Sequence, residues 1–272
     1  MKIVSPCLAR DLPVYRHTYQ SLLEHVPDAR PYVITRREDF QKFRDACGVE
    51  LILMDQDEMI QEMTIADLRV YPLHFFPAGA GWYFQQFLKW SFSDYCASDE
   101  SYLIWDADTI LTRSLQFKDS QGRTILTTSN EYHEPYFETY AELLGRGPND
   151  QISFISQHQL IEVKILRQLL DEISGRNGCN WPWAIMAKLR GNGTNLFSEY
   201  ETYGHYCLSN HPEAIVLRQL PWCRDGRQLA GFPPRSIKLS LLADRFAFVS
   251  FESNRSLRGW CVQRLRTFLN WY

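Results

Sequence analysis

The sequence lacks the patterns that define several common protein classes. Its seven cysteines are odd in number and scattered, with no C-x-x-C pair, which argues against a disulfide framework and against a zinc finger. The opening Met-Lys-Ile-Val-Ser-Pro has no apolar run like that of a secretion signal, and no stretch approaches the ~20 apolar residues that span a bilayer. These absences predict free thiols and a cytoplasmic location.

An excess of charge of one sign is also missing. The 272 residues carry a net charge of −3, so there is no global electrostatic reason to expect a nucleic acid partner. No Gly-rich loop that ends in Lys-Ser or Lys-Thr is present, which disfavours a P-loop kinase. Aromatic residues, in contrast, make up 14% of the chain, and Trp and Tyr either fill cores or line clefts that bind sugar rings.

Apolar runs and periodic segments alternate along the chain and predict an α/β fold, with a mostly parallel sheet flanked by helices on both faces. Asp11 is placed to cap the first helix, and Pro13 suits its first turn. The predicted strands are Lys2–Ser5, Tyr32–Thr35, Leu51–Met54, Tyr102–Trp105, Thr124–Thr128, Ala214–Leu217 and Phe246–Phe251. The predicted helices are Leu12–His25, Glu38–Ala46, Trp82–Tyr95, Pro135–Leu144, Leu160–Ile173 and Trp183–Leu189.

Two carboxylates come after one of these strands. Asp106 and Asp108 lie directly after Tyr102–Trp105, and residues i and i+2 of an extended segment point the same way. Ligands of open α/β sheets bind at the carboxyl ends of strands, and paired carboxylates there form an oxygen site suited to Mg²⁺ or Mn²⁺. Such a cation can stabilise the diphosphate of a departing nucleotide.

A second D-x-D pair, Asp55 and Asp57, also comes after an apolar strand. It leads into Glu58 and a polar stretch, which is typical of a solvated turn. Asp106 and Asp108 instead lie between apolar segments, where buried charges need a partner. We therefore favour Asp106 and Asp108 as the metal site.

Longer motifs surround this pair. Gly81–Lys89 reads G-W-Y-F-Q-Q-F-L-K, Tyr102–Thr109 reads Y-L-I-W-D-A-D-T, and Phe197–Gly204 reads F-S-E-Y-E-T-Y-G. Together they resemble a bacterial family of D-x-D glycosyltransferases of GT-A fold that was long known only as a domain of unknown function. The similarity extends from the first strand to about Tyr206. One departure is Trp90, where a smaller aliphatic residue is expected.

The resemblance implies a nucleotide-sugar donor, Mn²⁺ or Mg²⁺, and a role in building surface polysaccharide on a glycan or lipid-linked acceptor. It places Gln85, Gln86 and Lys89 near the donor, with Trp82 in the same motif. A lysine there can offset diphosphate charge, and glutamine amides can bond sugar hydroxyls. The alternative is a surface lysine beside solvated glutamines.

The segment that begins at Ser198 allows two interpretations. Ser198 and Glu201 fit a helix capping box, which would give Glu201 a structural task. An inverting sugar transfer needs a base on the acceptor side, and Glu199, with Glu201 as second choice, is a candidate. His205 or His211 could complete a metal shell as neutral imidazole, although a single histidine is more often structural. His158 is expected in a polar loop or helix start.

We expect one domain over residues 1–272, with a nucleotide-sugar and metal half at 1–130 and an acceptor half at 131–272. The tail from Arg255 to Tyr272 mixes arginines with Trp and Phe in a helical pattern. Helices of this composition lie on anionic membranes, which here would be the inner face of the cell membrane. The alternative is a helix that packs its apolar stripe on its own domain.

The sequence thus predicts a metal-dependent glycosyltransferase. Two alternatives stay open: a nucleotidyl- or phosphotransferase that uses the same carboxylates, and a non-catalytic carbohydrate-binding module.

Overall fold

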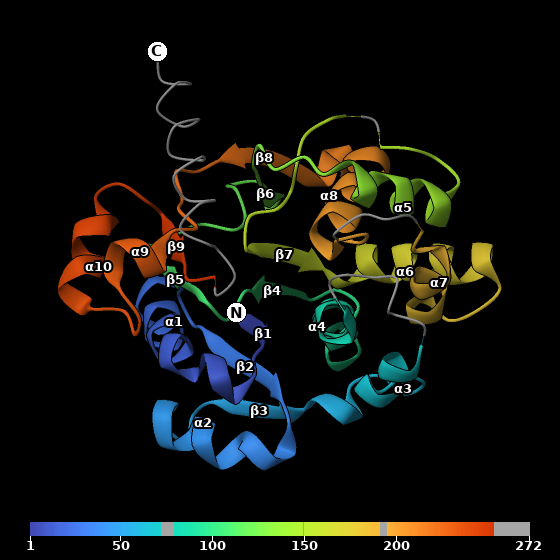
Figure 1. The fold of residues 1–272 in the computed structure, drawn as a ribbon. Coiled ribbons are helices and arrows are strands. Elements are labelled where there is room, and N and C mark those ends of the chain that lie inside the picture. The colour runs from blue at the N-terminus through green and yellow to red at the C-terminus, as the bar shows by residue number, and fades with distance from the viewer. Residues whose placement is uncertain (72–78, 149, 191–194, 253–272) are drawn as a thin grey trace.

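The computed structural model describes residues 1–71, 79–148, 150–190 and 195–252 (Figure 1). Its strands are β1 (Lys2–Pro6), β2 (Arg30–Thr35), β3 (Ile52–Asp55), β4 (Ser101–Trp105), β5 (Thr109–Leu111), β6 (Thr124–Thr128), β7 (His158–Glu162), β8 (Ile215–Gln219) and β9 (Phe248–Ser250). Its α-helices are α1 (Leu12–His25), α2 (Phe40–Cys47), α3 (Ile65–Val70), α4 (Gly79–Ser91), α5 (Glu134–Leu144), α6 (Val163–Asn177), α7 (Trp181–Lys188), α8 (Glu199–Asn210), α9 (Gly226–Ala230) and α10 (Ser236–Ala243). In the described ranges, every helix is too short or too polar to cross a bilayer.

The central sheet has the strand order β3-β2-β1-β4-β7. Its first four strands are parallel, and β7 runs antiparallel to β4. The carboxyl ends of β1 to β4 therefore meet at one edge, which is where open α/β sheets bind ligands. This arrangement confirms the predicted α/β class with a mostly parallel sheet.

Alternating side chains of the central strands form two cores, because successive residues of a strand point to opposite faces. Val4 and Ile104 pack on the side of α4 and α6, whereas Ile3 and Trp105 pack on the opposite side. Figure 1 shows α1 and α2 on one side of the sheet and α4 and α6 on the other. The sheet is thus covered on both faces, as its parallel strands require.

Three of the predicted strands lie outside the central sheet. Thr124–Thr128 pairs with Ile215–Gln219 as the parallel ladder β6-β8, and β9 pairs antiparallel with β5. The prediction of a helix over Leu160–Ile173 was wrong at its start, because Leu160 and Ile161 belong to β7 and the helix α6 begins at Val163. An apolar run of this length fits a buried strand as well as a buried helix turn.

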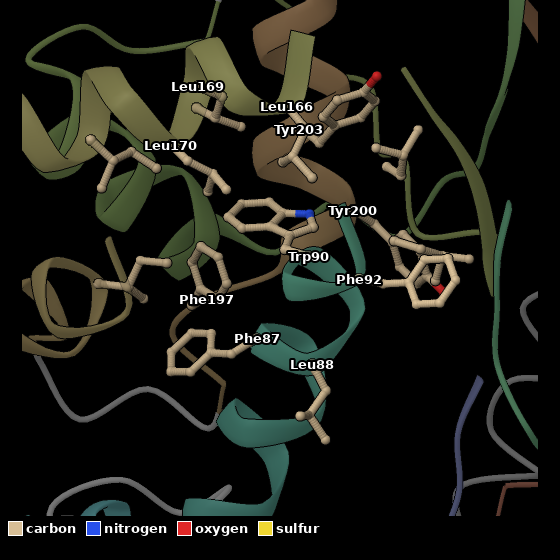
Figure 2. Packing of buried hydrophobic residues seen from close by; sticks show 14 of the residues in the cluster. Phe87, Leu88, Trp90, Phe92, Leu166, Leu169, Leu170, Phe197, Tyr200 and Tyr203 are labelled. Atoms are coloured by element: carbon tan, nitrogen blue, oxygen red, sulfur yellow. The ribbon is translucent and has the colours of Figure 1, made fainter. Parts of the chain in front are cut away.

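Trp90, the departure from the family pattern, is fully buried at the centre of the larger core. Its ring packs edge-on against Trp181 and Phe197 at 5.9 and 5.6 Å between centroids. Figure 2 shows it surrounded by leucines of α6 and by tyrosines of α8. The larger side chain is therefore accommodated by neighbouring elements and anchors α4 in the core.

Gly204 lets α8 approach the segment that precedes β7. A Cβ atom at this position would lie 2.3 Å from Cγ of the buried Phe154. The exposed Gly175 of α6, in contrast, has no atom within 4 Å of such a Cβ. The two helical glycines therefore differ only in what surrounds them.

We predict opposite effects for alanine at these two glycines. Gly175→Ala should stabilise the protein by about 0.5–1 kcal/mol through helix propensity. Gly204→Ala should destabilise it by about 1–3 kcal/mol, because overpacking outweighs the same gain. Urea unfolding measures both, and equal effects at the two sites would contradict the packing around Gly204.

His158 is a buried histidine of β7 rather than a polar loop residue. Its ring stacks on Trp105 at 5.0 Å. Nδ1 donates to the carbonyl of Ser156 (2.8 Å), so Nε2 accepts from the Thr127 hydroxyl (3.1 Å). Burial, together with the cation of Arg218, lowers the pKa of His158 to about 3. The imidazole is therefore neutral in the folded protein.

This pKa predicts a loss of stability in acid. The unfolded chain takes up a proton at His158 below about pH 6.5, whereas the folded protein does not until near pH 3, so stability falls as pH drops through this window. Between pH 7 and pH 5 the contribution is about 2 kcal/mol. Over this interval, the free energy of unfolding should therefore fall by about 2 kcal/mol less in His158→Gln than in the wild type. Equal pH dependence in the two proteins would refute the lowered pKa of His158.

Candidate active site

Asp106 and Asp108 lie at the carboxyl edge of the central sheet, directly after β4. They do not continue the strand: the amide of Thr109 donates to the carbonyl of Asp106 (3.0 Å) and closes a tight turn. The prediction that an extended backbone points both side chains the same way is therefore wrong. The two carboxylates enter different surroundings.

Lys89 of α4 is buried between two carboxylates. Its Nζ lies 2.6 Å from Oδ1 of Asp106 and 2.5 Å from Oε1 of Glu199. Its ammonium also lies over the Tyr200 ring, 4.5 Å from the centroid. Burial acts to lower the pKa of Lys89, but the two carboxylates outweigh it and raise the pKa above its ordinary value. Lys89 is therefore charged, and it is neither a surface lysine nor open to a ligand.

Gln86 joins the same two helices. Its Oε1 accepts from the backbone amide of Glu199 (3.0 Å), and its Nε2 donates to the carbonyl of Trp82 (3.2 Å). The Ser198 hydroxyl accepts from the amide of Glu201 (3.3 Å). Because both acceptors satisfy amides at the start of α8, they fix where Glu199 lies.

Asp106 is held on both carboxylate oxygens. The Tyr200 hydroxyl donates to Oδ1 (2.8 Å). The side-chain amide nitrogen of Gln157 donates to Oδ2 (3.0 Å), and the side-chain amide oxygen accepts from Nη2 of Arg224 (3.0 Å). With Lys89, Asp106 therefore accepts three hydrogen bonds, which leaves about one of its four lone-pair positions.

Arg224 lies partly buried behind this group. Its Nε donates to Oε1 of Glu131 (2.7 Å), and Nη1 pairs with Glu252. Burial opposes its charge, but Glu252, Glu131 and Asp106 raise the pKa of Arg224 above its ordinary value. The guanidinium of Arg224 therefore contacts three separate segments of the chain, at Glu131, Glu252 and Gln157.

The carboxylate of Asp108 has fewer and longer contacts than that of Asp106. Among the described residues the Asp108 carboxylate has only long contacts, from the hydroxyls of Ser250 (3.4 Å) and Thr109 (3.5 Å), and no lysine or arginine forms an ion pair with it. Burial, with the negative charges of Asp106 and Glu252, raises the pKa of Asp108 to about 7. A partly buried carboxylate in a negative environment is stabilised by a cation.

Glu201 and His205 are placed away from this group. Glu201 accepts from the Ser153 hydroxyl (2.5 Å) and from the amide of Phe154 (2.8 Å), so it supports a loop, and only the Ser198 half of the predicted capping box forms. Nε2 of His205 donates to the carbonyl of Ile152 (3.0 Å), and its ring is fully buried between aromatic rings. Both side chains therefore contact the loop before β7, and their roles as a base and as a metal ligand stay predictions.

In the described part of the chain, the side chains of the remaining candidates form no hydrogen bond or ion pair with Lys89, Asp106 or Glu199. Trp82 and Gln85 are half-buried on α4. His211 is the C-cap residue directly after α8, and its Nδ1 lies 4.0 Å from Oε1 of Glu213. Asp55 of the second D-x-D pair accepts from Arg37 (2.7 Å) and from the amide of Asp57 (3.2 Å), which is the structural turn expected for that pair. The predicted tail helix, residues 255–272, lies outside the described residues.

The donor set fits a divalent cation as an open site. Within the described ranges, no cluster of three or more His, Cys, Asp or Glu is arranged around a common metal position. Asp108 needs positive charge, and Asp106 retains one lone pair. Mg²⁺ is often bound by one or two carboxylates while phosphates and water supply the other ligands, so these two residues suffice for that mode.

Known proteins share the family and the fold. A family described as "Family of unknown function (DUF6492)" matches residues 11–222. Galactosyltransferase LgtC, solved with donor and acceptor sugar analogs, superimposes with a TM-score of 0.51 at 12% identity, over 98% of this chain and 94% of LgtC. An active-site mutant of LgtC gives 0.52 at 14% identity, over 99% and 95%. Mouse xyloside xylosyltransferase 1 gives 0.50 at 13% identity, over 94% and 100%. No curated protein sequence matches significantly.

Sequence reasoning missed the residues that hold Asp106 from behind. Tyr200 lies inside a recognised motif, and its aromatic character between two acidic residues was a usable signal. Gln157 and Arg224 lie in no motif, and no local pattern marks them. Their role arises from contacts between segments more than 40 residues apart.

We predict that Lys89→Met destabilises the protein by about 3–5 kcal/mol, because it leaves two carboxylates without their buried partner. Glu199→Gln in the same protein should reduce that loss by about 1–3 kcal/mol. Lys188→Met, which breaks a surface pair of 3.8 Å, should cost less than about 1 kcal/mol. Urea unfolding of the four proteins tests this, and a loss as small at Lys89 as at Lys188 would disprove the buried pairing.

Proposed function

Since the chain belongs to the family of unknown function DUF6492 and shares the fold of GT-A glycosyltransferases, we propose that it is a glycosyltransferase that uses a nucleotide-sugar donor. The observation that carries the proposal is Asp108, a carboxylate short of positive charge at the carboxyl edge of the parallel sheet. Fold alone does not determine activity, so the residues of this site support the proposal.

Asp108 and the remaining lone pair of Asp106 would hold Mn²⁺ or Mg²⁺, which when bound would offset the charge of the donor diphosphate. Lys89 acts on the donor indirectly. Its ammonium lies 2.6 Å from Oδ1 of Asp106 and so helps to orient that carboxylate. Tyr200 fixes the same oxygen from α8.

Glu199 is the proposed acceptor-side base for an inverting transfer. Gln86 and Lys89 set its position at the first turn of α8. Burial raises the pKa of Glu199, although the charge of Lys89 opposes this shift. A retaining transfer would not need this base. The acceptor is proposed to be a glycan or glycolipid, as in surface polysaccharide synthesis.

Thermal shift with a panel of nucleotide sugars and Mn²⁺ tests the proposal. A donor at 100 times its Kd adds about 2.7 kcal/mol, which for a chain of this size raises Tm by roughly 5–10 °C. Asp108→Asn should abolish the Mn²⁺-dependent part of the shift. Asp57→Asn, at the exposed second D-x-D pair, should retain it.

Asp108 is the better residue to change, because Asp106→Asn also disturbs Lys89 and Tyr200. A full Mn²⁺-dependent shift in Asp108→Asn would rule out the site. The products then identify the reaction: free nucleoside diphosphate is expected from sugar transfer, pyrophosphate would show nucleotidyl transfer, and glycan binding without turnover would show a binding module.

A further inference from the structure

Gln157 has a backbone conformation that non-glycine residues rarely adopt. Its φ is +62°, in the left-handed region, and its side chain is only 5% exposed. A residue other than glycine persists in this region when its surroundings hold it there, and such residues concentrate at functional sites. Glycine would adopt this φ without strain, so the side chain must contribute something that glycine lacks.

Gln157 holds Asp106 by two routes. Its backbone carbonyl accepts from the amide of Asp106 (2.9 Å), one step beyond the Trp105–His158 register pair of β4 and β7. Its side-chain amide donates to Oδ2 of Asp106 (3.0 Å). Both the main chain and the carboxylate of Asp106 are therefore fixed by the same residue.

Arg224 determines which way the amide of Gln157 faces. A guanidinium has donors only, so the amide oxygen must face Nη2 of Arg224 and the amide nitrogen must face Asp106. Arg224 is itself held by Glu131, which lies after β6, and by Glu252, which lies after β9. The orientation is thus set by segments distant in sequence.

We propose that Gln157 is a positioning residue that aims the Asp106 carboxylate at the donor-side cation, an inference that rests on the proposed function. The amide occupies Oδ2 while Lys89 and Tyr200 occupy Oδ1. One lone pair, on Oδ2, therefore stays available for a cation, and the hydrogen bond from Gln157 fixes its direction. Groups behind metal ligands that fix their orientation are worth about 10- to 100-fold in metal affinity.

Mn²⁺ binding to the full chain, monitored by the EPR signal of free Mn²⁺, tests this role without turnover. Gln157→Met keeps the length of the side chain and removes the amide, and it should weaken Mn²⁺ binding at least about 10-fold. Glycine adopts a φ of +62° without strain, so Gln157→Gly removes the amide without a backbone cost. It should show the same loss of Mn²⁺ affinity, even where methionine disturbs folding. The control Gln56→Met replaces another buried glutamine, which lies between Asp55 and Asp57 of the second D-x-D pair. Its Mn²⁺ affinity should stay within about two-fold of wild type.

A double-mutant cycle tests the contact independently of metal. Gln157→Met should change the unfolding equilibrium constant at least about five-fold more in the wild type than in Asp106→Asn, because the two residues interact. Additive effects, or wild-type Mn²⁺ affinity in folded Gln157→Met, would overturn the inference. If the wild type itself binds no Mn²⁺, the metal part of the proposed function fails, and the cycle still decides the role of Gln157.

Discussion

The site depends on one buried ammonium. Lys89 pairs with Asp106 and Glu199, and these three residues come from α4, the end of β4 and the start of α8. Charges are buried in proteins only when they are paired and hydrogen-bonded. The contact therefore does more than add stability: it makes the relative placement of a strand end and two helices a condition for burying any of the three charges.

Charge balance explains why the two aspartates of the D-x-D pair have different tasks. Asp106 is neutralised by Lys89 on one oxygen and linked through Gln157 to Arg224 on the other. In the described part of the chain, the Asp108 carboxylate receives only long hydroxyl contacts and lies near negative neighbours. The first carboxylate is thus an oriented part of the framework, and the second is the one that a cation from outside would stabilise. Local charge compensation, more than the D-x-D spacing, distinguishes them.

The sequence predicted the fold well where one physical signal dominated. Short apolar runs located β1 to β4 of the central sheet. The prediction was wrong at Leu160, which is strand rather than helix, because one apolar run fits both structures. The contacts of His205 and Glu201 with Ile152 and Ser153 could not be predicted, because these partners lie in a loop about 50 residues away. Gln157 and Arg224 could not be found, since their contacts exist only after the chain has folded.

The two motifs that flank the D-x-D pair form one physical unit. Gln86 and Lys89 lie three residues apart on one face of α4, and that face meets Glu199 and Tyr200. Gly204, one turn further along α8, permits close contact with the segment before β7, and Glu201 bonds the amide of Phe154 in the same segment. Each motif therefore supplies half of an interface whose outcome is the direction of the Asp106 carboxylate. A substitution at this interface would therefore act on the proposed donor site through that direction.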